Sequence, residues 1–189
     1  EIRDNKNLYF NSLAVFDNQL NLINSYNKVN LVPFGEFIPF KNILGFMGFR
    51  TIISEYKSFS SGLNRESLII KNDKFNLSLL PLICYEIIYS GKLFKNQKFD
   101  YIINISEDGW FGKSIGPKQH LAHSIFRSIE NGKYIIRSTN NGISAIINPM
   151  GVIERQVKFG DTGYIDFIDS KTVKTTLFSE YGNIIFLFL

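Results

Sequence analysis

The single cysteine of this 189-residue chain, Cys84, is the first residue whose type and position suggest chemistry. It directly follows the apolar segment 79–83, and a carboxylate, Glu86, lies two residues later. A thiolate is a strong nucleophile, but it forms at neutral pH only beside a base or a cation. A free cysteine is also a common buried apolar residue. The segment therefore leaves two interpretations open, a nucleophile at the end of a strand or a packed thiol.

Two further segments carry residues that could complete such a site. Residues 25–40 place Lys28 and Glu36 on either side of a Pro-Phe-Gly turn. A lysine there can donate hydrogen bonds to a developing oxyanion, and a glutamate can orient the lysine or carry a proton. Residues 104–120 contain three glycines, an acidic pair and the single tryptophan, Trp110. The alternatives are a solvated lysine with a loop-capping glutamate, and a tight connection packed by its own aromatic side chains.

The two histidines of the chain give a weaker signal. His120 and His123 both fall in a predicted helix. Either could serve as the base for Cys84, although nothing in the spacing requires it. The Gly-Lys-Ser sequence at 112–114 is not a phosphate-binding loop, because it lacks the upstream glycine at the required spacing.

The elements that would position these residues alternate between strands, one helix and hairpins. Residues 75–86 and 99–107 are mostly apolar, which is typical of buried strands in a parallel sheet, although Pro81 predicts a break or an edge in the first. Nucleophiles collect at the carboxyl ends of such strands, where Cys84 falls. Residues 116–134 predict a helix that stops at Gly132, since apolar residues recur at helical spacing: Leu121, Ile125, Phe126 and Ile129.

The rest of the chain predicts strands and a structured loop. Residues 8–17 and 18–27 favour two short strands, and the proline-containing segment 30–40 favours a loop. Residues 134–157 favour antiparallel strands, with turns at Asn141-Gly142 and at Met150-Gly151. Strands, a helix and hairpins in this order indicate a layered α/β domain.

The composition limits the class of protein. The length suffices for one domain with a sizeable core, and 44% hydrophobic residues exclude a disordered chain. One cysteine excludes a disulfide framework. The net charge of +4 is modest and its lysines and arginines are scattered, so we expect no nucleic-acid partner. No cofactor or metal is expected either.

Both ends of the chain look cut. It starts at Glu1, without a signal segment, and residues 183–189 form an apolar run that is too short to cross a membrane. This run is either a short buried strand or the first turns of a transmembrane helix.

Taken together, the segments resemble the nitrilase superfamily and, within it, the apolipoprotein N-acyltransferases. The motifs that carry the resemblance are Y-x-K-x-x-L-V-P-F-G-E, I-C-Y-E, W-F-G-x-S-x-G-P-x-Q-H and R-S-T-N-N-G. The resemblance runs from about Tyr9 to the C-terminal segment. It implies a nitrilase-like α-β-β-α sandwich that is incomplete at its N-terminus. Residues 1–182 would form the C-terminal portion of this domain, and residues 183–189 the start of a truncated transmembrane helix.

The resemblance also implies a reaction and its partners. An acyl chain would move from a phospholipid donor to the N-terminal cysteine amine of an apolipoprotein, at the periplasmic face of the bacterial inner membrane, without a cofactor. Cys84 matches the nucleophile that carries the acyl group as a thioester, and Lys28 matches the lysine that stabilises the oxyanion. The other matches are supporting carboxylates, the neighbour of the nucleophile and an aromatic residue near the substrate path: Glu36 and Glu86, Tyr85, and Trp110.

The sequence also departs from the family pattern. The general-base glutamate of the family lies well upstream of the lysine, whereas only 27 residues precede Lys28 and Glu1 is too close to it. We therefore expect the chain alone not to turn over, and a second chain could supply the upstream half. Smaller departures are Asn30 in place of histidine, and Glu107-Asp108-Gly109 in place of Asn-Asp-Ala.

Three further alternatives remain open at this point. The chain could be a soluble nitrilase-like amidase, or a non-catalytic half of a split or decayed enzyme. The aromatic-rich segment 37–49, in which Lys41 is the only charge, is either a part that dips into lipid or a buried helix.

Overall fold

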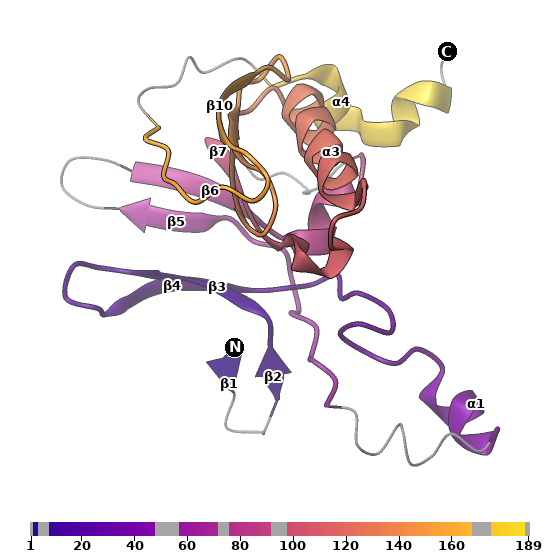
Figure 1. Ribbon diagram of the computed structural model, residues 1–189. Helices are drawn as coiled ribbons and strands as arrows, with labels where there is room; N and C mark the ends of the chain where they lie inside the picture. The colour runs from indigo at the N-terminus through magenta and orange to yellow at the C-terminus, as the bar shows by residue number, and fades with distance from the viewer. Residues whose placement is uncertain are drawn as a thin grey trace.

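A six-stranded sheet organises the computed structural model, which describes residues 2–3, 8–47, 57–71, 76–91, 98–167 and 175–187 (Figure 1). The strand order across the sheet is β10-β9-β8-β7-β6-β5. The strands in chain order are β5 (Leu68–Lys71), β6 (Asn76–Ile83), β7 (Tyr101–Glu107), β8 (Ile135–Asn140), β9 (Ser144–Ile147) and β10 (Ile153–Val157).

The centre of the sheet is parallel and its two sides are antiparallel. β6, β7 and β8 run parallel to one another, and β5, β9 and β10 pair antiparallel with their neighbours. This confirms the two predicted parallel strands and the predicted hairpins after residue 134. It also brings the carboxyl ends of β6 and β7 to the same edge of the sheet.

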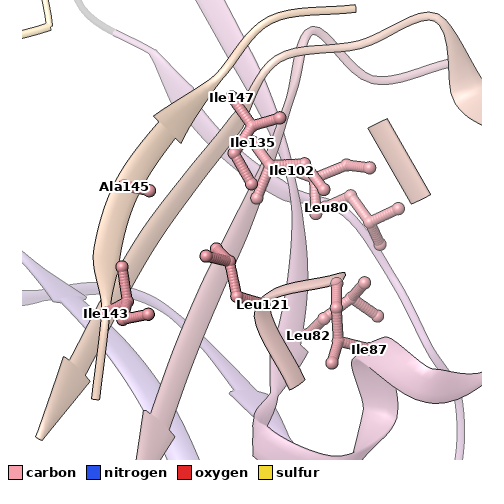
Figure 2. Close-up of a cluster of buried hydrophobic side chains, with 9 residues drawn as sticks. All are labelled: Leu80, Leu82, Ile87, Ile102, Leu121, Ile135, Ile143, Ala145 and Ile147. Carbon is pink, nitrogen blue, oxygen red and sulfur yellow. The ribbon is translucent and has the colours of Figure 1, made fainter. Parts of the chain in front are cut away.

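Both faces of β6 are covered, which explains its nearly continuous apolar sequence. Leu80 and Leu82 point into one cluster together with Leu121 of the helix α3 (Gly116–Asn131), as Figure 2 shows. Leu79 and Ile83 alternate with them and belong to a second cluster on the opposite face. Side chains that alternate between two buried faces require apolar residues at every position.

The second cluster is closed by a two-stranded hairpin. β3 (Ser12–Phe16) and β4 (Leu22–Asn27) pair antiparallel, and Leu13 and Tyr26 from them pack with Leu68 and Leu79. The described residues thus form three layers: helix α3, the six-stranded sheet and the hairpin (Figure 1). The predicted α/β class is confirmed.

The remaining elements are short. Strand β1 (Ile2–Arg3) pairs with β2 (Tyr9–Phe10). The helices are α1 (Lys41–Phe46) and α4 (Leu177–Tyr181), and the 3-10 turns are η1 (Cys84–Ile88), η2 (Asp108–Phe111) and η3 (Gly182–Leu187). In the parts of the chain that the structure describes, no helix has both the length and the apolar character needed to cross a bilayer.

The expected break at Pro81 does not occur, because β6 continues to Ile83. The pairing with β5 ends at Leu79, so Pro81 lies where β6 pairs with β7 alone. A proline lacks the N–H that a second neighbouring strand would need. The strand therefore accepts the proline without interruption, at a point that is an edge on one side.

The predicted apolar face of α3 is only half correct. Leu121 is buried, but Phe126 and Ile129 are 57% and 45% exposed. The buried side chains of the helix are mostly polar: His120, Ser124, Arg127, Ser128 and Asn131. The buried face of the helix contacts polar groups at the edge of the sheet as well as the apolar cluster. The spacing of its hydrophobic residues therefore did not predict which face is buried. The predicted stop is correct, since Gly132 caps α3 in the left-handed conformation.

Candidate active site

Cys84 lies at the carboxyl end of β6, where the strand turns into η1. Its φ angle is +50°, in the left-handed region that a residue with a side chain seldom adopts. Such a conformation costs free energy and persists only where the surroundings enforce it. The cysteine is partly buried. The thiol thus lies on a tight turn at the carboxyl end of a parallel strand, the edge at which ligands collect in open α/β sheets, and it also packs against the second apolar cluster.

A cavity of about 770 Å³ opens over Cys84. Its wall is mainly apolar and includes Val32, Ile88, Ile105, Trp110, Phe111 and Ile115. The polar side chains that line it include Glu36, Gln119, His120 and His123. A concave, largely apolar space with a few converging polar groups is the usual form of a small-molecule site.

Lys28 and Glu36 form an enclosed ion pair beside this cavity. Lys28 is 1% exposed, and its Nζ donates to both carboxylate oxygens of Glu36 at 2.8 Å. Glu36 also accepts hydrogen bonds from Asn11 Nδ2 and from the backbone N–H of Val32, both at 2.8 Å. The alternative interpretation of a solvated lysine is therefore wrong. Three donors fix the glutamate that lines the cavity, and the glutamate in turn fixes the lysine.

Glu86 is fully buried and does not line the cavity. Its Oε2 accepts the N–H of Ile83 at 2.9 Å, next to the cysteine. Its Oε1 accepts from four groups between 2.7 and 3.0 Å away: the Tyr26 hydroxyl, the N–H groups of Val29 and Asn30, and the Arg65 guanidinium. Glu86 therefore ties the loop that carries Lys28 to the turn that carries Cys84.

The aromatic residues near the nucleophile differ in their surroundings. Tyr85 lines the cavity and packs edge-on against Tyr89, with ring centroids 5.6 Å apart. Trp110 lines the cavity from η2 and is 79% exposed, so it lies at the rim.

A buried polar network lies beneath the cysteine. His120 Nδ1 is 2.8 Å from Asp108 Oδ1, and Arg137 Nη2 donates to Asp108 Oδ2 at 2.7 Å. The other ring nitrogen of His120, Nε2, is 3.2 Å from the carbonyl oxygen of Cys84. Burial raises the pKa of Asp108, but the hydrogen bond from His120 and the charge of Arg137 outweigh it and hold this pKa below its ordinary value.

The sequence model of the carbon-nitrogen hydrolase family matches residues 1–175. The chain belongs to the carbon-nitrogen hydrolase family. Relatives include apolipoprotein N-acyltransferases, from Rickettsia prowazekii (strain Madrid E) at 41% identity over 176 residues and from Rhodopseudomonas palustris at 36% over 176 residues. These alignments cover 92% and 93% of this chain but 34% and 32% of the relatives, so the chain spans about a third of their length.

Solved structures agree on the fold of this carbon-nitrogen hydrolase domain. The carbon-nitrogen hydrolase from Helicobacter pylori G27 superposes with a TM-score of 0.60 at 15% identity, over 83% of this chain and 56% of that one. A mutant of the amidase from Nesterenkonia sp. AN1 superposes with a TM-score of 0.50 at 16% identity, over 78% of this chain and 51% of that one. These likenesses show the nitrilase-like fold that the sequence motifs imply.

Four of the residues expected at the site line one cavity in this domain: Glu36, Cys84, Tyr85 and Trp110. Lys28 joins them through its ion pair with Glu36. Glu86 is set apart from the cavity and holds the site's two loops together instead.

The network of Asp108, His120 and Arg137 was not predicted. His120 was considered only as a base for Cys84, and the pairing with Asp108 and Arg137 was missed, because the three residues lie on η2, α3 and β8 and share no spacing. The available signal was their place in the motifs: Asp108 two residues before Trp110, His120 at the end of G-P-x-Q-H, and Arg137 at the start of R-S-T-N-N-G. Within the described ranges, no three His, Cys, Asp or Glu side chains are arranged to hold a metal ion.

Proposed function

We propose that this domain transfers an acyl chain from a membrane phospholipid to the N-terminal cysteine amine of an apolipoprotein, through a thioester on Cys84. The observation that carries the proposal is the placement of Cys84, on a left-handed turn that opens into an apolar cavity beside an enclosed lysine–glutamate pair. The names of the relatives support the same reaction. Both partners belong to the periplasmic face of the bacterial inner membrane, which is therefore the proposed location.

The proposed reaction has two steps that balance. The Cys84 thiolate attacks the carbonyl carbon of a phospholipid ester. The single bond between this carbon and the glycerol oxygen breaks, and the lysophospholipid leaves as an alcohol after it takes up a proton. The amine of the acceptor then attacks the thioester, loses a proton and releases the thiolate. Each step passes through an oxyanion, and Lys28 is proposed to stabilise it while Glu36 keeps the ammonium in place.

The apolar wall of the cavity supports a fatty acyl chain as the group transferred. A space of about 770 Å³ lined by isoleucine, valine and aromatic side chains gains free energy from every methylene that it takes from water, about 0.8 kcal/mol each. A small polar amide would cover only a small part of this apolar wall and would leave the rest in contact with water. The cavity thus fits a lipid donor better than a small amide.

We expect the replacement of Lys28 by methionine to slow acylation of Cys84 by about 10²–10³-fold, the usual effect of losing one oxyanion donor. Methionine keeps the length of the stem in the enclosed position but cannot donate. The release of p-nitrophenolate from p-nitrophenyl decanoate under single-turnover conditions measures this rate. Lys28→Met leaves the Glu36 carboxylate without its ion-pair partner. The double variant Lys28→Met/Glu36→Gln removes this unpaired charge, and it should be as slow as the single variant. A Lys28→Met rate equal to that of the wild type would exclude Lys28 from the reaction.

An exposed apolar surface supports a membrane as partner. Helix α1 stands well apart from the six-stranded sheet (Figure 1). The α1 patch, as we call it, consists of side chains on and around this helix that are 60–90% exposed: Phe34, Phe40, Ile43, Phe46 and Met47. Over its described residues the alternative of a buried helix is therefore wrong; Phe49 lies outside the described residues. Aromatic and aliphatic side chains around a single lysine, Lys41, are typical of a surface that inserts into the headgroup region.

The double variant Phe40→Ser/Phe46→Ser should bind vesicles of phosphatidylethanolamine and an anionic phospholipid at least tenfold more weakly, because each phenylalanine contributes about 1.5–3 kcal/mol when buried. Its melting temperature should stay unchanged, since both side chains are exposed. Co-sedimentation with vesicles measures the binding. Tyr164→Ser is the matched control, because Tyr164 is 87% exposed and lies in the segment after β10. A loss of stability without a loss of binding would show that the α1 patch is core.

The direct test of the function compares two reactions. A diacylglyceryl lipopeptide with a free N-terminal cysteine amine is offered together with phosphatidylethanolamine, and mass spectrometry detects the N-acylated product. Acetamide is offered separately, and ammonia is measured. Transfer without ammonia release supports the proposal, and ammonia release without transfer would make the domain an amidase.

A further inference from the structure

We infer that His120 is a positioning residue for the nucleophile: the ring is held by Asp108, and its Nε2–H donates a hydrogen bond to the carbonyl oxygen of Cys84 and fixes the turn that presents the thiol. This inference rests on the proposed role of Cys84 as nucleophile. It assigns to His120 a task other than proton transfer to or from the thiol.

The strained turn needs a partner that holds it. Cys84 adopts a φ of +50°, which a residue with a Cβ atom avoids unless neighbouring groups enforce it. Its carbonyl oxygen lies 3.2 Å from His120 Nε2, within hydrogen-bond reach. The ring belongs to α3, which is anchored on the sheet through Leu121. A hydrogen bond from this ring therefore joins the strained peptide to a rigid element.

Both nitrogens of the ring have partners. Nδ1 lies 2.8 Å from Asp108 Oδ1 and 3.3 Å from Arg137 Nη2, so the Asp108–Arg137 pair holds this side of the ring. Nε2 faces the backbone carbonyl of Cys84, which only accepts, so a hydrogen bond there requires a hydrogen on Nε2. The ring is 4% exposed, and it therefore lies enclosed between the buried pair and the cysteine turn.

Asp108 is itself held so that it cannot turn away from His120. It is fully buried, its Oδ2 accepts from Arg137 and its Oδ1 accepts from the Ser106 hydroxyl at 2.7 Å. Gly142, the glycine of the R-S-T-N-N-G motif, lies directly against Asp108, since a Cβ atom at this position would collide with Asp108 Oδ2. Asp108 is therefore held at both carboxylate oxygens, and it fixes the His120 ring through the contact with Nδ1.

A pair of substitutions separates the two contacts of the ring. His120→Gln places an amide N–H near the position of Nε2 and can still donate to the Cys84 carbonyl, whereas His120→Asn places its amide near Nδ1 and keeps only the contact with Asp108. Cys84 is the single cysteine of the chain, so intact mass after iodoacetamide treatment follows this residue alone. We expect alkylation at pH 7.5 to slow by about tenfold or more in His120→Asn and by about threefold or less in His120→Gln. Equal rates in the wild type and in a folded His120→Asn variant would overturn the inference.

A measurement on the unaltered chain covers the case in which the variants do not fold. The ¹⁵N shifts of a histidine ring show which of its nitrogens carries a hydrogen, and His123→Gln assigns the signals of the two histidines. We expect Nε2 of His120 to carry a hydrogen at pH 7.5, and a ring whose Nε2 carries none would overturn the inference. Neither readout uses an acyl donor. A locked, reactive cysteine without acyl transfer would therefore count against the proposed function and leave the role of His120 standing.

Discussion

Replacing Cys84 by alanine should abolish the hydroxylamine-sensitive acyl adduct that the protein forms with p-nitrophenyl decanoate. The thiolate is the only nucleophile that the protein itself supplies in the proposed reaction, and no other cysteine exists in the chain to form a thioester. Intact mass before and after hydroxylamine measures the adduct. The expected loss is complete, because no partial function of the thiol survives in alanine.

The matched control is Tyr164→Ser, which should acylate like the wild type because its side chain is exposed and lies outside the cavity. An adduct of equal yield in Cys84→Ala, or one that resists hydroxylamine in the wild type, would show that another residue is acylated. Cys84 would then be a packed thiol on a strained turn.

Replacing Glu86 by alanine should lower the free energy of unfolding by about 3–5 kcal/mol, the usual effect of breaking a buried ion pair. The carboxylate is fully buried, and its loss removes the ion-pair partner of Arg65 and leaves three backbone N–H groups without their acceptor. For a chain of this size, that corresponds to a melting temperature lower by about 10 °C. Thermal unfolding followed by circular dichroism measures the change.

Glu66→Ala is the control for this prediction, since Glu66 is exposed and a surface substitution usually changes stability by about 0.5 kcal/mol or less. At low temperature, where Glu86→Ala is still folded, it should also acylate more slowly, because Glu86 ties the Lys28 loop to the Cys84 turn. A stable Glu86→Ala variant that has lost acylation would instead indicate that Glu86 takes a direct part in the reaction.

The parts of the fold that the sequence predicts correctly are those with a continuous apolar run or a distinctive capping residue. Residues 79–83 and 101–103 are apolar at every position because both faces of the sheet are covered, and apolar runs of this kind are typical of buried parallel strands. Gly132 ends α3 as expected, because few other residues adopt the left-handed cap. The position of Cys84 followed from the end of its strand.

The candidate site was harder to predict for residues that bond to other residues of the protein and do not line the cavity. Glu86 lies two residues from the nucleophile, which suggests a role in the reaction, yet its five acceptor contacts bind two loops together. Arg65 gave no signal, because its partners lie 21 to 39 residues away in the chain. Contacts between distant segments leave no spacing pattern.

The buried face of α3 was mispredicted for a related reason. Hydrophobic periodicity assumes that the covered face is apolar. His120, Ser124 and Arg127 are buried because they bond to Asp108, Arg137 and the backbone around η1, while Phe126 and Ile129 remain at the surface. A polar interior next to an active site inverts the pattern.

Mass spectrometry of the protein after incubation with phosphatidylethanolamine vesicles tests the proposed acyl transfer most directly. The chain is incubated alone and together with the N-terminal portion of the Rickettsia prowazekii relative, and the modified peptide is sequenced. We expect one fatty acyl group on Cys84, removed by hydroxylamine and passed on to the amine of an added diacylglyceryl lipopeptide. A Cys84 that stays unmodified in both samples, although iodoacetamide alkylates it readily, would contradict acyl transfer by this domain.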